Sequence, residues 1–288
     1  MRLFQNSVGA EVTRRKPLGI RRLLTSSPTV LKEPLMTTTF PTQPVAVISG
    51  GLGDIGFATA HALKRTGCRV ALGDLRVTGR NTDGFQVNPV DVASEASVSA
   101  WFDAVEAAFG EPASVIVVNA GIVCLGSAMA ATVDDWNRTL SVNLTGAWLT
   151  ARVGARRLIE KKMPGRIVFV GSWAGHAPHV ELAAYCAAKA GLRMLTQCLA
   201  LELADKGILV NEVAPGYVNA GLSGQFFKKD PECAARSRAA VPVGELIEVD
   251  EVAAAIAYLC SPAHRNLTGS TLLLDGGLSL LRSPVVKS

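Results

Sequence analysis

Short apolar segments alternate with helical patterns along most of the chain. The predicted strands cover residues 44–49, 69–73, 85–88, 114–118, 166–170, 209–213 and 271–274. Between them, apolar residues recur at helical spacing, which predicts a first helix ending at Thr66-Gly67 and further helices over 94–109, 134–162, 182–204 and 250–260. Strands without a polar face are typical of a parallel sheet that helices cover on both sides. The pattern predicts one α/β domain with a doubly wound parallel sheet of about seven strands.

The composition and charge narrow the possible classes of protein. Because 49% of the residues are hydrophobic and 18% are charged, an intrinsically disordered chain is excluded. The net charge of +5 lies within residues 1–43, which carry seven basic and two acidic side chains. Residues 44–288 therefore have no net charge, and we expect no nucleic-acid partner.

Residues 1–43 form a basic extension that precedes the predicted domain at 44–288. The extension contains many Arg, Ser and Thr residues and few acids. One explanation is a dispensable or misassigned start, with Met36 as the true first residue of a cytoplasmic protein. The other is a mitochondrial transit peptide, which would place the protein in the mitochondrial matrix.

The cysteines and the longest uncharged stretch predict neither a metal site nor a membrane span. The six Cys residues show no CxxC or Cys/His spacing, so we expect buried thiols in a reducing compartment. The uncharged stretch 112–133 is interrupted by Asn119-Ala-Gly121. We therefore interpret it as a buried strand followed by a turn.

A glycine-rich segment joins the first strand to the first helix. Gly50, Gly53 and Gly56 lie where backbone N–H groups and a helix N-terminus can approach a pyrophosphate. Asp74 ends the second strand, where a carboxylate can accept hydrogen bonds from ribose hydroxyls and repel a 2′-phosphate. This predicts NAD(H) as the cofactor in preference to NADP(H), with Arg76 as a rival cation nearby.

Several motifs occur in a fixed order along the chain. After the glycine-rich segment come Asn119-Ala-Gly121, Ser172, Tyr185-Cys-Ala-Ala-Lys189 and Pro215-Gly216. In this order the chain closely resembles the classical short-chain dehydrogenase/reductases, from about Val45 to Leu278. The resemblance implies a Rossmann-type fold and an oxidoreductase that transfers hydride between a nicotinamide dinucleotide and a secondary alcohol or ketone.

The Tyr185 and Lys189 pair has chemistry that follows from its spacing. Residues i and i+4 share one helix face, so the Lys189 ammonium can approach Tyr185 and lower its pKa from ~10. Tyr185 could then act as general acid or base. The resemblance implies that Ser172 binds the substrate oxygen and that Asn143 holds a water that links Lys189 to solvent. Ser172 and Tyr185 are thus the predicted substrate contacts.

The resemblance also implies a set of cofactor contacts. They are Gly50, Gly53, Asp54, Ile55, Gly56, Asp74, Asp91, Val92, Asn119, Ala120, Gly121, Tyr185, Lys189, Pro215, Gly216 and Val218. Asp54 stands where the family has its middle loop glycine, and we expect it to cap the following helix. No metal site is predicted.

The segment 217–241 matches the position of the family's mobile substrate lid. The segment contains Phe226 and Phe227. Its cations either meet an acidic substrate or form a solvated helix face, and they are Lys228, Lys229, Arg236 and Arg238. His176 and His179 could line the pocket or lie at the surface. The resemblance further implies a homo-oligomer, a dimer or tetramer, built through the helices at 134–162 and 182–204.

Three functions remain open at this point. The first is an NAD(H)-dependent alcohol dehydrogenase or ketone reductase. The second is a 3-oxoacyl-carrier-protein reductase that uses NADPH. The third is a non-catalytic dinucleotide-sensing protein of the same fold. The intact Asn143, Ser172, Tyr185 and Lys189 set argues against the third, and Asp74 argues against the second.

Overall fold

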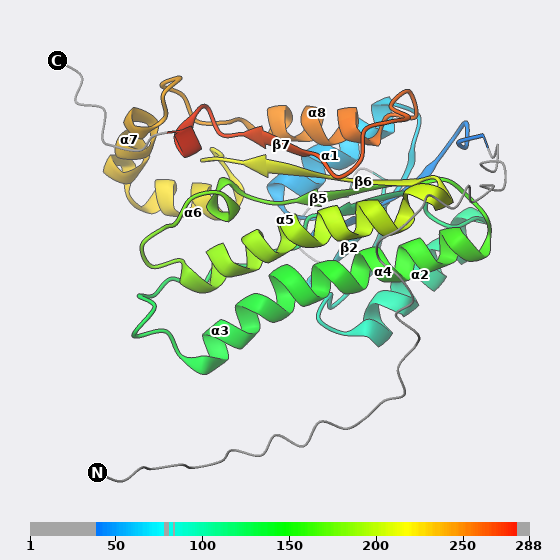
Figure 1. The fold of residues 1–288 in the computed structure, drawn as a ribbon, viewed down its shortest axis with the longest axis horizontal. Helices are drawn as coiled ribbons and strands as arrows, with labels where there is room; N and C mark the ends of the chain where they lie inside the picture. Colours follow the sequence, from blue (N-terminus) through cyan, green and yellow to red (C-terminus); the bar gives the residue numbers. More distant parts are fainter. Residues whose placement is uncertain (1–38, 78–80, 83, 281–288) are drawn as a thin grey trace, which may run out of the picture. The chain divides into compact units, whose positions relative to one another are not determined.

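A twisted parallel sheet forms the centre of the fold (Figure 1). The computed structural model describes residues 39–77, 81–82 and 84–280. Within them, the seven strands are β1 (Val45–Ser49), β2 (Arg69–Asp74), β3 (Gln86–Pro89), β4 (Val115–Val118), β5 (Gly165–Val170), β6 (Ile208–Pro215) and β7 (Thr271–Leu274). Their order is β3-β2-β1-β4-β5-β6-β7, and every neighbouring pair is parallel. The predicted doubly wound Rossmann-type sheet is confirmed.

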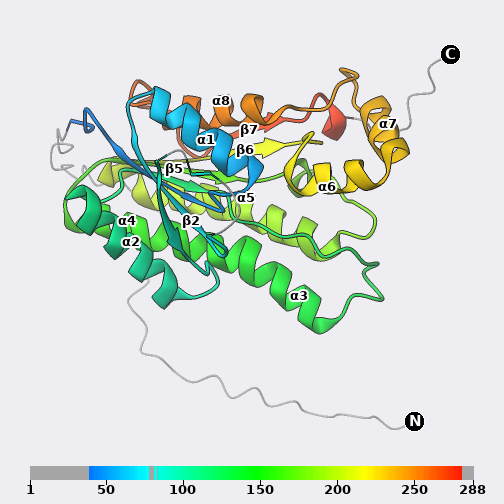
Figure 2. The same ribbon diagram turned by 180° about the vertical axis from the view of Figure 1, so that it is seen from behind.

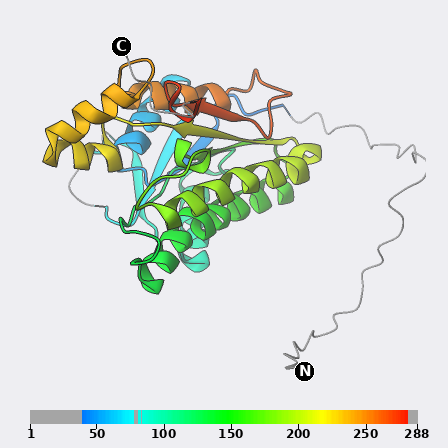
Figure 3. The ribbon, with the colours of Figure 1, turned by 60° about the vertical axis from the view of Figure 1, so that its left-hand side comes forward.

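Helices cover both faces of this sheet (Figures 2 and 3). One face carries α1 (Asp54–Arg65) and α8 (Val249–Cys260), which pack against each other. The other face carries α2 (Glu95–Phe109), α4 (Ala147–Glu160) and α5 (Ala183–Leu203). In Figure 3 the sheet lies between the blue and orange helices above and the green helices below.

The apolar strand residues divide between these two layers by alternation. Val45 and Val47 of β1 pack in the cluster that contains α2, α4 and α5 side chains. Ala46 and Ile48 pack instead in the cluster that contains α1 and α8 side chains. All four are fully buried, as expected when successive side chains point to opposite faces of a doubly covered sheet.

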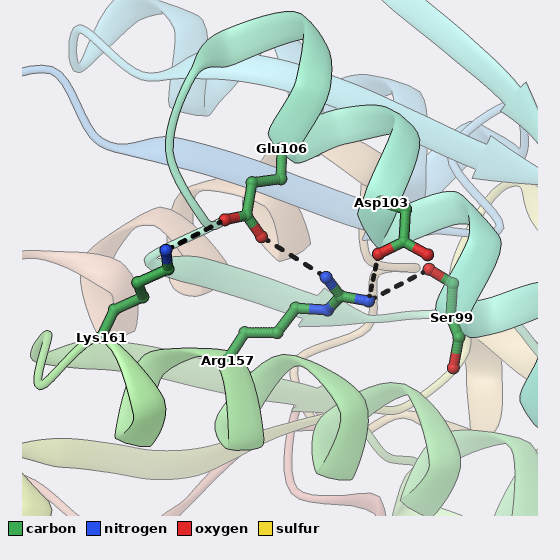
Figure 4. Close-up of polar contacts among 5 residues, drawn as sticks. All are labelled: Ser99, Asp103, Glu106, Arg157 and Lys161. Carbon is green, nitrogen blue, oxygen red and sulfur yellow. Dashed lines mark hydrogen bonds and ion pairs between the residues drawn. The ribbon is translucent and has the colours of Figure 1, made fainter.

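A polar contact network joins α2 to α4 at the outer surface (Figure 4). The Arg157 guanidinium of α4 lies 2.8 Å from Asp103 and 3.4 Å from Glu106, both on α2. It also donates a hydrogen bond of 3.2 Å to the Ser99 carbonyl, while Lys161 reaches Glu106 at 3.9 Å. These contacts orient two helices whose inner faces supply the apolar packing.

The helix predicted over 134–162 is not regular, and this part of the prediction is wrong. The structure has α3 (Val133–Leu140), a π-helical turn η1 (Ser141–Gly146) and then α4. Asn143 in this turn donates from Nδ2 to the Thr139 carbonyl, four residues back, at 2.9 Å. That side-chain bond competes with the backbone bond of a regular α-helix, so the turn widens.

Two short helices lie at the carboxyl ends of the strands. They are α6 (Gly221–Lys229) and α7 (Pro231–Ala240), within the predicted lid 217–241 (Figure 1, gold). The side chains of Phe226 and Lys228 lie outside the described residues. Residues 1–38 also lie outside them, so the assignment of 1–43 as an extension stays a prediction.

Candidate active site

A cavity of about 710 Å³ opens at the carboxyl edge of the sheet, between the glycine-rich turn and α6. Ligands of open α/β sheets bind at this edge, next to the switch between neighbouring crossovers. The predicted residues that line the cavity are Gly50, Gly53, Asp54, Ile55, Asn119, Ala120, Gly121, Ser172, Tyr185, Lys189, Pro215, Gly216 and Val218. Sequence segments separated by more than a hundred residues thus meet around one space.

The glycine-rich turn is packed so closely that side chains are excluded. Gly50 has a φ of +62°, and a Cβ there would lie 2.9 Å from the Ala120 Cα. A Cβ on Gly56 would lie 2.3 Å from the Gly50 carbonyl oxygen. The turn, which ends in the N-terminus of α1, therefore borders the cavity with its backbone at Gly50 and Gly53, while Gly56 lets the chain pack closely behind it.

Asp74 and Asn119 hold this turn in place. The Asp74 Oδ2 accepts a hydrogen bond of 3.0 Å from the Leu52 amide. The Asn119 Nδ2 donates to the Ser49 and Gly50 carbonyls at 3.1 and 2.9 Å. Both side chains therefore position the turn through its backbone, whatever they contact in a bound ligand.

Asp54 differs from its predicted role. The N-cap of α1 is Gly53, and Asp54 is the first helical residue, so the prediction that Asp54 caps this helix is wrong. Its Oδ2 instead accepts a hydrogen bond of 2.9 Å from the Gly221 amide, the first residue of α6. Asp54 thus joins the glycine-rich turn to the lid.

Asn143 lies beside the cavity and fixes the chain after β4. Its Nδ2 donates to the Ile122 carbonyl at 2.9 Å, and its Oδ1 accepts from the Ile122 amide at 3.2 Å. The π-helical turn brings the amide into this position. Gly56, Asp74, Asp91, Val92 and Asn143 do not line the cavity itself.

The predicted adenine contacts also have local roles. Asp91 is exposed and its Oδ1 accepts a hydrogen bond of 2.9 Å from the Ala93 amide. Val92 is buried against Gly146 in the π-helical turn. These contacts shape the turn after β3 and leave the adenine assignment a prediction.

Ser172, Tyr185 and Lys189 come together on one wall of the cavity. Ser172 is almost fully buried, and its Oγ accepts a hydrogen bond of 3.1 Å from the Ala174 amide, so it also caps the short helix η2 (Trp173–Gly175). Lys189 is 4% exposed, and its Nζ donates a 2.8 Å hydrogen bond to the Val170 carbonyl. The Lys189 Nζ lies 5.6 Å from the centre of the Tyr185 ring.

The pKa values of this group follow burial more than charge. Burial raises the pKa of Tyr185 to about 12, and a hydrogen bond with Ser172 partly opposes this increase. The pKa of Tyr185 is therefore raised overall and not lowered as expected, because burial outweighs any effect of the Lys189 charge. Burial also lowers the pKa of Lys189 to about 8, against a smaller opposite effect of Glu212. At neutral pH the Tyr185 hydroxyl is protonated and Lys189 is mostly charged.

An aromatic series of four side chains lines the cavity, and two of its members, Trp173 and Tyr217, were not singled out from the sequence. The rings of Trp173 and His179 pack edge to face with their centres 4.0 Å apart. The ring centres of Trp173 and Tyr217 are 5.3 Å apart, and those of Tyr217 and Phe227 are 6.4 Å apart. All four side chains line the cavity. A usable signal was their position just after strand ends or in the lid, where ligands of such sheets bind.

The charged lid residues face solvent. Lys229, Arg236 and Arg238 are exposed, and Arg236 pairs with Asp230 and Glu232 of its own segment. His179 lines the cavity and His176 does not. The interpretation of the lid cations as a solvated helix face fits these positions better than contact with an acidic substrate.

Other predictions concerned metals, membranes and thiols. In the part of the chain that the structure describes, no cluster of three or more His, Cys, Asp or Glu side chains is suited to a metal ion. No described helix combines the length and hydrophobicity needed to span a bilayer. Cys68 and Cys260 are buried, as expected, but Cys198 is exposed.

Comparison with known proteins places this geometry in a family. A protein-family model described as enoyl-(acyl carrier protein) reductase matches residues 51–279. The 3β-hydroxysteroid dehydrogenase 1 of Eggerthella lenta is 39% identical over 66% of this chain and 72% of its own length. The 3-oxoacyl-(acyl-carrier-protein) reductase of Salmonella typhimurium is 33% identical over 82% of this chain and 98% of its own.

A similar solved structure comes from Beutenbergia cavernae, where it is a candidate NAD(P)-dependent gluconate 5-dehydrogenase with bound NADP at low occupancy. It superposes with a TM-score of 0.76 at 28% identity and covers 84% of this chain and 99% of its own. The two curated relatives and this solved structure each cover about two thirds or more of the chain. The chain belongs to the classical short-chain dehydrogenase/reductase family, whose members bind a nicotinamide dinucleotide and act as oxidoreductases on alcohols and ketones.

Proposed function

We propose that the protein transfers hydride between NAD(H) and a secondary alcohol or ketone, with Tyr185 as the general acid or base. The observation that carries this proposal is the convergence of Ser172, Tyr185 and Lys189 on a cavity bordered by the glycine-rich turn. The Ser172, Tyr185 and Lys189 side chains can transfer a proton, and the glycine-rich turn can hold a dinucleotide.

The turn fits a dinucleotide because no side chain covers its backbone N–H groups where a pyrophosphate would lie. The Cβ positions of Gly50 and Gly56 are filled by the protein's own backbone, so N–H groups and the α1 N-terminus border the cavity. Gly50, Gly53 and Ile55 would hold the phosphates, and Asn119, Pro215 and Val218 would lie along the remainder of the cofactor. When bound, the nicotinamide supplies the hydride acceptor or donor.

Proton transfer falls to the chain's own residues. Since the pKa of Tyr185 is raised to about 12, its hydroxyl is protonated at neutral pH and suited to donate to a ketone oxygen. Ser172 can donate a second hydrogen bond to that oxygen and stabilise developing charge. The buried Lys189 supplies a positive charge near the phenol, which favours phenolate as the proton leaves.

Asp74 supports NAD(H) over NADP(H). Its carboxylate lies at the end of β2 and accepts from the turn amide of Leu52, close to where the adenosine ribose of such folds lies. A 2′-phosphate would meet like charge there. Fluorescence titration with NADH and NADPH tests this: NADH should bind more tightly, and Asp74→Ala should lower that preference at least about tenfold. Tight NADPH binding without an NADH response would contradict it.

The aromatic series supports a substrate with uncharged, apolar substituents. Trp173, Tyr217 and Phe227 present ring faces and edges to the cavity, and the side chains of Leu125 and Leu222 add apolar surface. Transfer of an apolar substrate ring from water into this part of the cavity is favourable in free energy. Transfer of a carboxylate is unfavourable, because the charged group loses its hydration. A panel that pairs each neutral secondary alcohol with its carboxylated analogue tests this preference.

The proton-transfer assignment is tested with two tyrosine variants of the same cavity. Tyr185→Phe should lower kcat at least about 100-fold, because general acid–base catalysis is lost, while NADH affinity is unchanged. Tyr217→Phe is the matched control, since it removes a cavity phenol and leaves Tyr185 in place. Comparable residual turnover in the two variants would refute the assignment of Tyr185.

A 3-oxoacyl-carrier-protein reductase that uses NADPH is the second candidate function. The Salmonella typhimurium relative, at 33% identity, and the NADP held by the Beutenbergia cavernae structure favour it. Reduction of an acetoacetyl thioester with NADPH but not NADH would support this candidate. The non-catalytic alternative would be supported if the protein bound dinucleotide and turned over none of the alcohols or ketones.

We also propose a cytoplasmic homo-oligomer, a dimer or tetramer, in which residues 1–43 are dispensable. Trp148 on α4, with Met194 and Leu201 on α5, presents exposed apolar surface on the helices predicted to pair. Light scattering after size-exclusion chromatography measures the assembly. Deletion of residues 1–43 should leave turnover unchanged.

A further inference from the structure

A buried glutamate lies behind the proton-transfer wall. Glu212 is on β6, has no exposed surface and is not among the side chains that line the cavity. Ile208 and Val210 of the same strand pack with Leu192 of α5. Because strand side chains alternate, Glu212 points to this same α5 side of the sheet.

The packing around Glu212 leaves one carboxylate oxygen without a hydrogen bond. Thr271 on β7 donates from its hydroxyl to Oε2 at 2.6 Å. Oε1 is buried, and no described residue donates a hydrogen bond to it. A Cβ on Gly171, the residue before Ser172, would lie 1.8 Å from Oε1, so the carboxylate occupies the space of that missing side chain.

The charged groups that face Glu212 come from α5. They are Lys189 and Arg193, one helical turn apart, of which Lys189 is buried and Arg193 is exposed. β7 contributes the uncharged Thr271 hydroxyl, and β5 contributes the Val170 carbonyl that accepts from the Lys189 Nζ. Gly171 follows β5 directly and lies against the Glu212 carboxylate. Lys189 and Glu212 are therefore two buried ionisable side chains that lie beside adjacent residues, Val170 and Gly171, at the end of β5.

Each of these buried groups alters the titration of the other. Burial lowers the pKa of Lys189 to about 8, and Glu212 opposes that decrease. Burial raises the pKa of Glu212, and the Thr271 hydrogen bond and then Lys189 oppose that increase. An ammonium in a dry interior is stable only with a partner charge or strong hydrogen bonds.

We propose that Glu212 is a positioning residue that keeps Lys189 in its charged form from behind the cavity. The Lys189 ammonium has one hydrogen bond to a neutral carbonyl, and Glu212 supplies the negative charge that this bond lacks. The effect on turnover rests on the proposed role of Lys189 beside Tyr185, whereas the charge coupling itself does not. Because Glu212 does not line the cavity, it acts through Lys189 and not on a bound substrate or cofactor.

The coupling is measured on the full chain without any substrate. The variants are Glu212→Gln, which removes the charge but keeps the shape, and Glu202→Gln, which removes an exposed carboxylate from α5. NMR of protein labelled with ¹³C at lysine Cε follows each ammonium, and Lys189→Arg assigns the Lys189 signal. Glu212→Gln should lower the Lys189 titration midpoint by about one pH unit. Glu202→Gln should leave it unchanged.

Equal Lys189 midpoints in the wild type and Glu212→Gln would overturn the proposal. If Glu212→Gln does not fold, the same coupling is read from the other partner. Proton linkage is reciprocal, so Lys189→Met should raise the Glu212 midpoint, followed by ¹³C carboxyl NMR, by about one pH unit. An unmoved Glu212 midpoint would then overturn it.

A pH profile of kcat separates this proposal from the proposed function. With any alcohol that is oxidised, Glu212→Gln should move the alkaline limb to lower pH with little change in KM, because Lys189 loses its charge earlier. A shifted Lys189 midpoint in a protein that oxidises no alcohol would refute the dehydrogenase assignment and leave the charge coupling intact. A shifted midpoint with an unmoved kcat profile would refute the role of Glu212 in the reaction.

Discussion

Burial of the Lys189 ammonium should cost the folded protein stability at neutral pH. Lys189 is 4% exposed, and its pKa falls from the ordinary 10.5 to about 8. Since one pKa unit corresponds to ~1.4 kcal/mol, this difference is worth about 3 kcal/mol. The perturbation that tests it is Lys189→Met, which removes the charge and keeps most of the apolar stem.

The sign of the pH dependence follows from which state holds the proton. Below pH 8 both states are protonated, so the folded wild type carries the full cost of the buried charge. Between pH 8 and 10.5 the unfolded chain keeps a proton that the folded protein has released. The free energy of unfolding of the wild type should therefore rise with pH in this window, relative to Lys189→Met, by about 3 kcal/mol.

Urea denaturation at intervals from pH 7 to about 10.5 measures this difference. The variant lacks the hydrogen bond from Lys189 to Val170 at every pH. Its loss therefore changes the free energy of unfolding by a constant amount and does not alter the pH dependence. Lys206→Met, at an exposed lysine, is the control and should run parallel to the wild type. If the wild-type and Lys189→Met curves are also parallel, the ammonium is not buried at a cost and the reasoning fails.

Three further variants test the turn, the lid and the helix layer. Gly56→Ala places a Cβ 2.3 Å from the Gly50 oxygen, so NADH affinity should fall roughly tenfold in a fluorescence titration; unchanged affinity would show that the turn does not hold the cofactor. Asp54→Ala removes the 2.9 Å bond to the Gly221 amide, so α6 should be cleaved faster in limited proteolysis, with equal rates counting against the link. Arg157→Met should lower the free energy of unfolding, measured in urea, by about 1 kcal/mol, because the Arg157 side chain is 20% exposed and its ion pairs are partly screened. An unchanged free energy would show that packing of the apolar part of the side chain, which Met retains, is enough to hold α2 and α4 together.

The sequence predicted most of the sheet because the strand signal is local. The runs that became β1, β4, β5 and β6 are buried throughout, whereas β3 and β7 at the sheet edges are only partly buried. The strand β6 extends from Ile208 to Pro215, beyond the predicted 209–213 at both ends. Asn211 and Glu212 lay inside the predicted strand, but their hydrogen-bond partners were not predicted. Polar residues inside a buried strand have no local signature, because their partners come from distant segments.

The irregular turn at Ser141–Gly146 shows a different limit. Its apolar spacing continues that of the flanking helices, so periodicity predicts one continuous helix. The turn widens because the Asn143 side chain bonds to Thr139 within the helix and to Ile122 in another segment. The second contact exists only once β4 and this helix are packed together.

The sequence by itself determined the order of strands and helices, the glycine-rich turn and the Tyr185 to Lys189 spacing, because each depends on neighbours within a few residues. The tertiary structure decided the pKa values and the long-range contacts of the side chains in these segments. It buried both Lys189 and Glu212, raised the pKa of Tyr185 to about 12 and turned Asp54 towards Gly221. Burial and long-range contacts set these properties, and neither is encoded in spacing along the chain.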